Sequence, residues 1–382
     1  MKPKRKKLSA YQTGIVIISV FVAASLILSR ISSFCDFYTN HIFPFGIQTY
    51  GRLTGLFPFS AGEFLIVLAA LLIILQLIFA LLLISFHKRQ RYRQFVRTYS
   101  KCMLTAALLT TGVVTLNCSM LYNCSRLDPG GGRQTESDPG QIRVLRNFIV
   151  ERCNTLSGQM TRDENGDVVT NGDLNEEIKT AMRKLSTDYP RLSGYYPNPK
   201  PIFASFLMYQ AGYDGVYFPF SLEANYNTYI SDIRYPHIAC HELAHLKGYI
   251  YEDEADFIAY LACVGSDNIQ LQYAGYLGVL SYIESDYRQT IRGGEDAPAQ
   301  EIADRVRRDA ASYTRATYEK LTEKEKEKII DSEVVETASQ RFTDAYMDYY
   351  GAEPNYAEVT KLLLAYYGEN GDPAQGQTPD HS

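Results

Sequence analysis

Three long apolar runs dominate the first third of the chain, at residues 13–29, 64–86 and 102–122. An α-helix needs about 20 mostly apolar residues to cross the ~30 Å hydrocarbon core of a bilayer. The second and third runs reach that length, and the first reaches it when residues 11–31 are counted. The pattern therefore predicts a membrane region at residues 1–127, with transmembrane helices at about 11–31, 64–86 and 102–122.

Basic residues flank these runs unevenly and predict their orientation. Segment 1–10 and the 87–101 loop are rich in Lys and Arg, whereas the 30–62 loop holds only Arg30 and Arg52. Because basic flanks stay in the cytoplasm, we expect a multi-pass protein of the cell membrane, with a cytoplasmic N-terminus and an extracytoplasmic chain after residue 122. The aromatic 30–62 loop, broken by Pro and Gly, is expected at the membrane interface. No small-residue cleavage site follows the first run, which favours an uncleaved anchor over a signal peptide.

The pattern changes after residue 127. Residues 128–140 are rich in Gly, Asp and Pro and predict a linker. Helical periodicity follows at 142–154, 174–185, 267–285, 299–321, 323–350 and 353–367, and apolar runs at 202–209 and 216–220 predict strands. We therefore expect an α+β, mostly helical domain with a small β-sheet at residues 141–368, and a disordered polar tail at residues 369–382.

The net charge of −5 is divided unevenly along the chain. Before residue 122 there are 13 Lys and Arg against Asp36 and Glu63, a net of +11, so the remainder carries −16 by subtraction. An acidic domain lacks the basic surface that binds phosphate backbones, which argues against nucleic acid as a partner. The lipid bilayer is one expected partner, and the motif described next adds a peptide or protein substrate.

The segment His241-Glu242-Leu243-Ala244-His245 is the most specific chemical pattern in the chain. Residues four apart share one face of an α-helix, so both imidazoles can face one ion with Glu242 beside them. This H-E-x-x-H arrangement is typical of zinc hydrolases, in which the carboxylate is not a ligand but accepts a proton from the attacking water. It predicts one Zn²⁺ per chain, with His241 and His245 as ligands and Glu242 as the catalytic base. The alternative is a charged helix face that fits the pattern by chance.

A third ligand must come from outside this helix, because side chains of one straight helix cannot close a tetrahedral site. His237, one turn earlier, is therefore expected to be structural. The next helix opens with Glu252, whose face continues through small or acidic residues, whereas Glu254 shares its face with large apolar residues. We take Glu252 as the third ligand and Glu254 as the alternative, and we expect Asp256 to accept a hydrogen bond from a ligand histidine.

Two further features concern the substrate. In zinc proteases an edge strand beside the metal commonly pairs with the substrate backbone. The candidate here is Gly215-Val216-Tyr217-Phe218, with Val216, Tyr217 and Phe218 as the expected substrate-binding residues. An ordinary core hairpin is the alternative. The chain contains 30 Tyr, and a phenol could donate to the developing oxyanion. The sequence does not choose among the candidates, which include Tyr346, Tyr349, Tyr350 and Tyr356.

The HELAH segment followed by the acidic residues 252–256 resembles the gluzincin group of metallopeptidases, in which two His and a Glu hold zinc. The E-x-x-A-D pattern is similar to that of membrane-bound CAAX-processing and HtpX-like proteases, whose first Glu is the third ligand, and this resemblance implies Glu252. Most of the chain is more similar to an uncharacterised bacterial family of membrane proteins with an N-terminal multi-span region and an HELAH-x-x-G-[FY]-x-x-E-x-E-A-[ND]-F segment, here residues 241–257. The CAAX-type and HtpX-type enzymes have a longer insert before the Glu, so their substrates do not carry over.

The sequence therefore predicts a membrane-anchored zinc metalloendopeptidase, in which a gluzincin-like domain follows a three-helix transmembrane region. The alternative is a non-catalytic, zinc-containing envelope sensor or scaffold that binds a peptide or a cell-envelope ligand. The 87–101 loop is too short for a cytoplasmic effector domain, which weakens that alternative. Intramembrane proteolysis is disfavoured because residues 236–256 are too polar for a membrane span.

Overall fold

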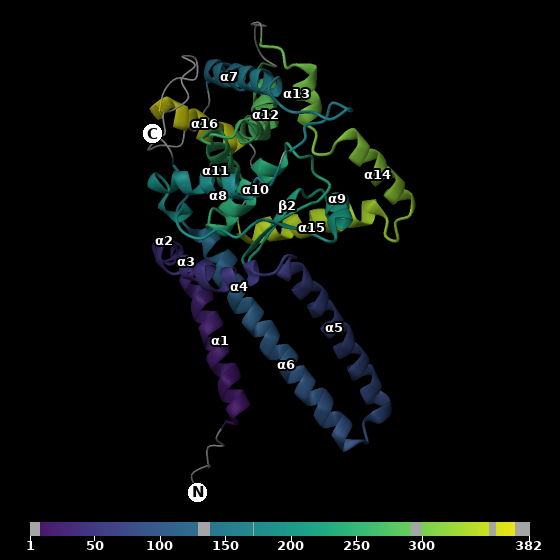
Figure 1. Ribbon diagram of the computed structural model, residues 1–382. Helices are drawn as coiled ribbons and strands as arrows, with labels where there is room; N and C mark the ends of the chain where they lie inside the picture. Colours follow the sequence, from purple (N-terminus) through teal and green to yellow (C-terminus); the bar gives the residue numbers. More distant parts are fainter. Residues whose placement is uncertain (1–7, 129–137, 171, 292–298, 351–356, 371–382) are drawn as a thin grey trace.

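The computed structural model describes residues 8–128, 138–170, 172–291, 299–350 and 357–370. These residues are mostly helical and contain one small three-stranded sheet, which confirms the predicted composition of the fold. Figure 1 shows three long helices that extend to one side of a body made of the remaining elements. Most of the predicted linker and most of the predicted tail, at residues 129–137 and 371–382, lie outside the described residues.

Three helices are long and apolar enough to cross a membrane, as the apolar runs predict. They are α1 (Ala10–Leu28), α5 (Ala61–Phe86) and α6 (Gln90–Val114), and α6 continues into the wider turn η2 (Thr115–Ser119) and then η3 (Leu121–Asn123). Gly62 is the only buried residue of α5. A helix that is apolar on all sides and exposed along its length fits a lipid environment rather than water.

The predicted 87–101 loop is wrong, because α6 already begins at Gln90. The rings of Phe95 and Tyr99 pack against Phe79 of α5, with centroids 5.1 and 5.2 Å apart. The Tyr99 hydroxyl also donates to the Leu72 carbonyl over 2.8 Å. This aromatic stripe makes the basic segment an amphipathic helix, which a search for continuous apolar runs does not detect.

The segment between α1 and α5 is helical, not a loop broken by Pro and Gly. Pro44 lies in the first turn of a helix, where its missing N–H removes no hydrogen bond. Phe43 and Ile47 are buried, so this segment packs under the body. Its elements are α2 (Ser32–His41), α3 (Phe43–Gly46), η1 (Ile47–Gly51) and α4 (Arg52–Gly55).

The centre of the body is a pair of helices, α10 (Tyr235–Leu246) and α11 (Glu252–Val264). Nearly every side chain of both is buried, which places the core here. α8 (Asn175–Lys184), α12 (Ile269–Ile291) and α16 (Ala357–Asn370) pack against this pair, and α7 (Pro139–Ser157) covers α12. The peripheral elements are η4 (Leu185–Thr187), η5 (Pro190–Leu192), α9 (Ser205–Ala211), α13 (Asp304–Asp309), α14 (Arg315–Lys326) and α15 (Ser332–Tyr350).

Two helices predicted near the C-terminus are wrong in extent. The first, at 299–321, is divided into α13 and α14, and the second, at 323–350, begins only at Ser332. Thr314 starts α14 as a cap, because its side chain accepts a hydrogen bond from the Thr317 N–H over 3.2 Å. Such caps use residue types that also occur on exposed helix faces, so the periodicity alone hides these breaks.

The sheet has the strand order β1 (Lys200–Pro201), β3 (Glu223–Tyr226), β2 (Gly215–Phe218). β1 is parallel to β3 and β2 is antiparallel to it, with Gly215 opposite Tyr226 and Phe218 opposite Glu223. β2 is therefore an edge strand within this sheet. Its position agrees with the strand predicted at 216–220, although it ends two residues earlier.

The strand predicted at 202–209 is wrong, because Ser205–Ala211 form the helix α9. A short apolar run does not distinguish a strand from a helix. Glu63 of α5 favours the helix, since its carboxylate accepts hydrogen bonds from the N–H groups of Phe203 (2.8 Å) and Ala204 (2.7 Å) at the helix start. Gly212, with φ 78°, ends α9 in the left-handed conformation typical of glycine.

A second carboxylate joins the sheet to α5 in the opposite direction. Glu223 of β3 accepts hydrogen bonds from the N–H groups of Ala61 (3.2 Å) and Gly62 (2.7 Å) at the start of α5. It also pairs with Lys200 of β1 over 2.5 Å, and both side chains are buried, at 1% and 6% exposure. Lys200 further donates to the Thr54 carbonyl over 2.7 Å. The sheet and the start of α5 are thus held together by a buried, charged network.

We expect Glu223→Ala to lower the free energy of unfolding by about 3–5 kcal/mol, because it leaves the Lys200 ammonium buried without its counter-ion. Denaturant unfolding of the full chain in detergent measures this loss. The double variant Lys200→Met/Glu223→Gln, which leaves no buried charge, should lose less. Equal stability of Glu223→Ala and the unaltered protein would contradict the role given to this ion pair.

Candidate metal centre

α10 places its two motif histidines side by side in the core. The His241 and His245 rings lie 4.5 Å apart between centroids, and their side chains are 14% and 7% exposed. Pro236 lies in the first turn of the helix, and Gly248, with φ 91°, turns the chain just after its end. A Cβ at Gly248 would lie 2.7 Å from Thr39, so only glycine permits this sharp turn toward α11.

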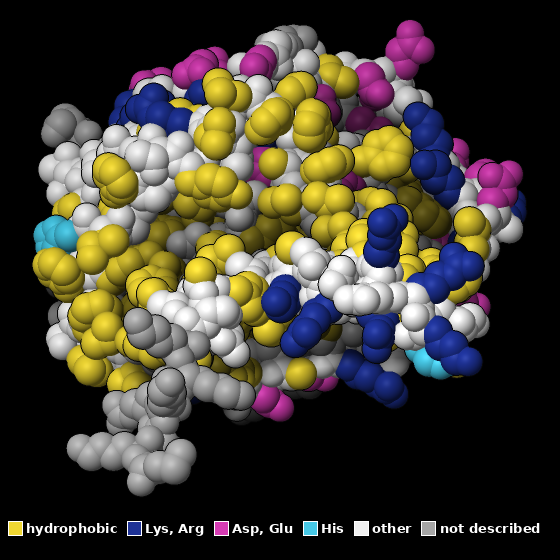
Figure 2. Space-filling view, turned by 90° about the horizontal axis from the view of Figure 1, so that it is seen from below, with side chains coloured by type: hydrophobic (Ala, Val, Ile, Leu, Met, Phe, Trp, Pro, Cys, Tyr) yellow, Lys and Arg dark blue, Asp and Glu magenta, His cyan; other side chains and the backbone are white. Residues whose placement is uncertain are grey.

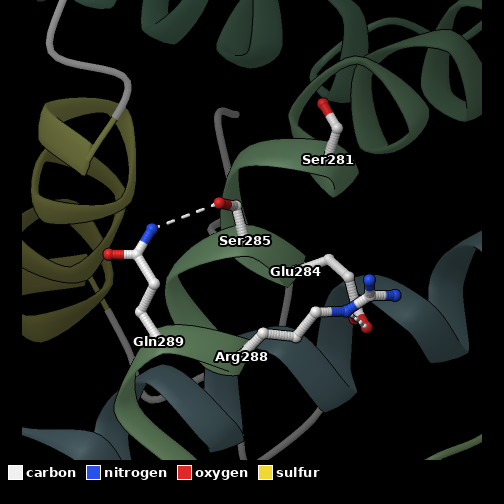
Figure 3. Close-up of a pocket in the computed structure, with 5 residues that line it drawn as sticks. All are labelled: Ser281, Glu284, Ser285, Arg288 and Gln289. Carbon is white, nitrogen blue, oxygen red and sulfur yellow. Dashed lines mark hydrogen bonds and ion pairs between the residues drawn. The ribbon is translucent and has the colours of Figure 1, made fainter. Parts of the chain in front are cut away.

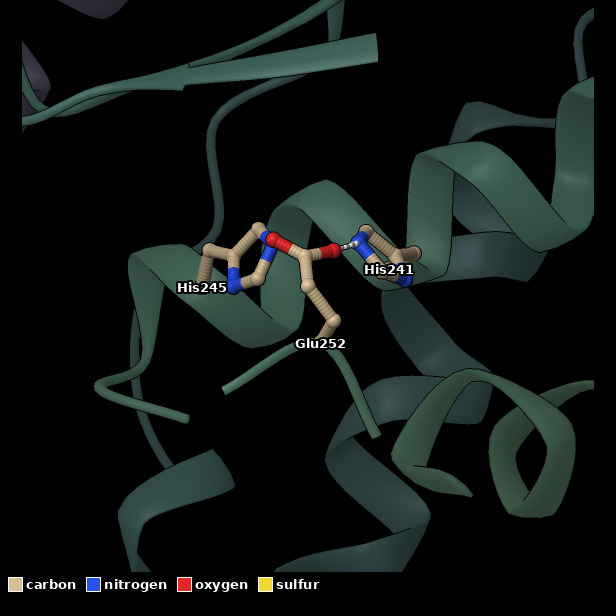
Figure 4. Close-up of side chains that lie close together, drawn as sticks. All are labelled: His241, His245 and Glu252. Carbon is tan, nitrogen blue, oxygen red and sulfur yellow. Dashed lines mark hydrogen bonds and ion pairs between the residues drawn. The ribbon is translucent and has the colours of Figure 1, made fainter. Parts of the chain in front are cut away.

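α11 begins with Glu252, whose carboxylate faces both imidazoles (Figure 4). One oxygen lies 3.1 Å from His241 Nε2 and the other lies 3.6 Å from His245 Nε2. One ligand atom from each of the three residues lies within 4.8 Å of the others. The Glu252 side chain is 44% exposed, so this side of the cluster is open to solvent.

The second nitrogen of each imidazole is also engaged. His241 Nδ1 lies 2.7 Å from a carboxylate oxygen of Asp256, as the sequence predicts for a partner of a ligand histidine, and His245 Nδ1 donates to the Tyr249 carbonyl over 2.9 Å. Hydrogen bonds at Nδ1 leave Nε2 for a metal and set the ring orientation. The Tyr249 carbonyl could not be predicted, because a backbone acceptor has no sequence signal.

The pKa shifts reflect the charge balance of this cluster. Burial lowers the pKa of His241, but the Asp256 and Glu252 carboxylates outweigh it and raise that pKa well above its usual range. Burial raises the pKa of Glu252, and here the two imidazoles outweigh it and lower the pKa. A metal cation bound by the same imidazole nitrogens and carboxylate oxygens would displace the protons that these groups share.

Glu254, the alternative ligand, lies elsewhere. Its carboxylate accepts a 2.6 Å hydrogen bond from Arg126 and a 2.9 Å bond from the Leu127 N–H. Arg126 also pairs with Asp253 and lies over the Tyr251 ring, 3.6 Å from its centroid. The structure therefore brings Glu252 to the histidines and ties Glu254 to the segment that follows η3.

Glu242, the expected base, is buried beside the two histidines but is not one of the three residues whose ligand atoms converge. Its Oε2 has no hydrogen-bond partner among the residues that the structure describes. Burial raises the pKa of Glu242 to about 7, although the neighbouring imidazoles oppose this shift. A Cβ at Gly215 would overlap the Glu242 carboxylate, so the first residue of β2 lies directly against it.

The three expected substrate-binding residues follow Gly215 along the edge strand. Tyr217 is buried, with its ring centroid 6.5 Å from that of His245, whereas Val216 and Phe218 are half-buried. The strand thus runs past His245 as well as past Glu242. Its first residue, Gly215, opens the strand that the sequence indicates, and only the structure shows that it touches Glu242.

The remaining candidates lie outside the cluster. His237 is buried, and a Cβ at Gly278 of α12 would overlap its ring, which fits a structural role. The Tyr346 hydroxyl is 2.9 Å from Cys118 Sγ and the Tyr350 hydroxyl is 3.0 Å from Ser119 Oγ, so both phenols already have partners. Tyr349 is 59% exposed, and Tyr356 lies outside the described residues.

A surface hollow of about 620 Å³ is lined by residues of α12 (Figure 3). Two of its five lining residues, Glu284 and Arg288, pair over 3.1 Å. Glu284 also pairs over 2.9 Å with Arg146, which is not part of the lining. The other lining residues are Ser281, Ser285 and Gln289. None of these five residues belongs to the His and Glu cluster, so the hollow has no part in the site.

Residues 38–364 match the model of a family described as protein of unknown function (DUF3810). The chain belongs to this family. The matched range begins in α2 and ends in α16, so it includes α5, α6, the sheet and all residues of the cluster. No curated protein and no solved structure matches the chain.

The donor set fits a zinc ion. Two imidazole nitrogens and one carboxylate are a common zinc ligand set, and bonds of about 2.0–2.2 Å place tetrahedral ligand atoms about 3.3–3.6 Å apart. The Glu252 oxygens lie 3.1 and 3.6 Å from the two Nε2 atoms. Each distance uses a different carboxylate oxygen, and one ligand atom of each residue lies within 4.8 Å of the others, so His241, His245 and Glu252 would hold the ion after an adjustment of their side chains.

Replacing the two glutamates separately distinguishes the third ligand. We expect Glu252→Gln to lose zinc during dialysis, because its amide binds the ion far less well than a carboxylate. Glu254→Gln should keep one zinc per chain but unfold at lower temperature, since Arg126 loses a charged partner. Metal content and thermal unfolding measure both effects, and the reverse pattern of zinc retention would contradict the assignment.

Asp256→Asn should lower zinc affinity by about 10–100-fold, because the carboxylate that orients His241 is lost while the side-chain volume is kept. Competition with a zinc chelator measures the affinity. Asp253→Asn is the matched control, since Asp253 lies three residues earlier on the same helix but pairs with Arg126. Equal affinities of the two variants would exclude a specific role for Asp256.

Proposed function

We propose that this protein is a membrane-anchored, zinc-dependent metallopeptidase that hydrolyses peptide bonds. One observation carries the proposal: His241, His245 and Glu252 converge, while Glu242 is buried beside them against an edge strand. Three protein ligands are the pattern of catalytic zinc sites, whereas structural sites have four. Among the described residues the cluster contains three.

The proposed roles follow from the side chains. Zinc, when bound, supplies a Lewis acid that lowers the pKa of water and polarises a carbonyl. Glu242 accepts a proton from the attacking water and later delivers it to the leaving amine. The buried position of Glu242 keeps its pKa in the range useful for both steps. Asp256 and the Tyr249 carbonyl keep the two imidazoles in place.

The edge strand β2 supplies the proposed substrate contact. An extended peptide can add to a free strand edge through main-chain hydrogen bonds that do not depend on its side chains. Because Gly215 touches Glu242, a peptide aligned with β2 passes the catalytic base. The resemblance of the 241–257 segment to gluzincins, and to the E-x-x-A-D pattern of membrane-bound proteases, supports the same chemistry.

The location is also part of the proposal. The three apolar helices anchor the chain in the cell membrane, and the basic flanks favour a cytoplasmic N-terminus with the metal centre outside the cytoplasm. A non-catalytic envelope sensor or scaffold remains the alternative function. It gives no reason for a buried carboxylate oxygen beside the ligands that has no hydrogen-bond partner among the described residues, whereas a hydrolase needs a carboxylate there as the base.

Glu242→Gln separates the two functions. We expect this variant to keep zinc and to lose peptide hydrolysis by at least about 100-fold, the scale of a general acid–base contribution. Zinc content and cleavage of a peptide library by the full chain in detergent are the measurements. Unreduced cleavage by Glu242→Gln would exclude Glu242 as the base, and absence of cleavage by the zinc-loaded unaltered protein would favour the sensor.

A further inference from the structure

The strand β2, which borders the candidate metal centre, leads directly to the body-side ends of two apolar helices, α5 and α6. At one end of β2, Gly215 touches Glu242. At the other end, a Cβ at Gly62 would overlap the Phe218 ring, so Phe218 lies against the first turn of α5. Three residue steps separate Gly215 from Phe218, about 10 Å at the rise of a β-strand.

The same end of β2 also meets the end of α6. Asn117 of η2 donates from Nδ2 to the Pro219 carbonyl over 2.7 Å, and its own carbonyl accepts from the Tyr217 hydroxyl over 3.4 Å. The chain that leaves β2 therefore lies between the body-side ends of α5 and α6. Figure 1 shows these two helices meeting far from the body and diverging toward it.

Contacts between α5 and α6 agree with this divergence. In the described chain, the hydrogen bonds that join them run from Tyr99 to the Leu72 carbonyl, from Tyr92 to the Phe79 carbonyl and between Gln76 and Ser100. All of them lie in the part of α5 beyond residue 71. Along residues 61–71 no hydrogen bond or ring contact to α6 is present in the described part of the chain. The apolar surface of α5 nearest the sheet is thus available to lipid or to another apolar segment.

Apolar side chains surround this junction on the protein surface. Leu56 and Phe203 are 78% and 97% exposed, and Phe57 and Phe59 are 44% and 51% exposed. Figure 2, which views the molecule from the side of the three helices, shows a face covered largely by hydrophobic side chains. Exposed rings next to a candidate membrane span fit the interface of a bilayer and not open water.

The sheet cannot shift away from α5 without losing the hydrogen bonds of the buried Glu223 carboxylate. Glu223, which is opposite Phe218 in the sheet, binds the first N–H groups of α5, and Glu63 of α5 binds those at the start of α9. The distance from the proposed base to the membrane end of β2 is therefore set by the fold. A peptide aligned with β2 would have one end at Glu242 and the other at the bilayer surface.

We propose that the substrates are membrane-anchored polypeptides, cut within a few residues of their apolar anchor. The anchor lies in the bilayer beside α5 and α6, and the extended segment outside it aligns with β2. The inference rests on the proposed peptidase function and adds the substrate class. An acyl chain or a transmembrane helix would both serve as the anchor, because the recognised chemistry is an extended peptide joined to an apolar group.

The test uses the full chain in phosphatidylcholine liposomes and one pool of random octapeptides presented in three ways. The pool is free, attached to a palmitoyl chain, or attached to a Leu/Ala helix of about 20 residues. Each anchored form carries a Gly/Ser spacer of about 3 or about 20 residues. The long spacer keeps the peptide equally concentrated at the membrane but lets it reach away from the surface, and Glu242→Gln measures the background.

We expect initial cleavage to be at least about tenfold faster with the short spacer than with the long one, because only the short spacer places the peptide beside β2. Cleavage of only one anchored form would identify the anchor and support the proposal. Equal rates with both spacers, or with the free pool, would overturn it and leave the peptidase intact. No cleavage in any form would refute the peptidase itself, and with it this inference.

Discussion

The burial of Glu242 and His245, with His241 largely buried beside them, is the constraint on which this fold depends. Polar groups removed from water are costly unless they have partners. α11 supplies Glu252 and Asp256 to His241, and the turn after α10 supplies the Tyr249 carbonyl to His245. Ala255 and Ala259, both fully buried, let the two helices approach closely. The core is thus arranged around polar atoms, and a buried oxygen of Glu242 is left without a partner in the described chain.

The acidic residues that open α11 have two different sets of partners. Glu252 faces the histidines, whereas Asp253 and Glu254 bind Arg126 just after the end of α6. Because these side chains share one helical turn, the segment that leaves α6 also holds the turn that carries Glu252. Together with the Glu223 and Glu63 contacts at α5, this attaches the His and Glu cluster to the apolar helices at two separate places.

This attachment gives the proposed peptidase its particular character. A soluble hydrolase needs no rigid connection between its site and an apolar helix, and flexible linkers suffice to anchor a domain. Here the edge strand beside the base ends between α5 and α6, and buried charges hold it there. The position of the His and Glu cluster relative to the three apolar helices is therefore as informative for the proposal as the cluster itself.

The sequence by itself determined the apolar helices and the motif helix, because each depends on local periodicity. It also determined that Glu252 and Asp256 share one face of the next helix, because they are one turn apart. It also placed β2, whose pattern is short but bounded by turns. Only the tertiary structure decided that residues 205–211 are helical, since the Glu63 carboxylate caps that helix from a distant segment. Tertiary structure likewise decided that Glu252 and not Glu254 lies at the histidines. Glu254 instead binds Arg126, which is more than 120 residues away in the chain. Local patterns are carried by neighbouring residues, whereas a cap, an ion pair or a backbone acceptor such as Tyr249 depends on which segments meet in space.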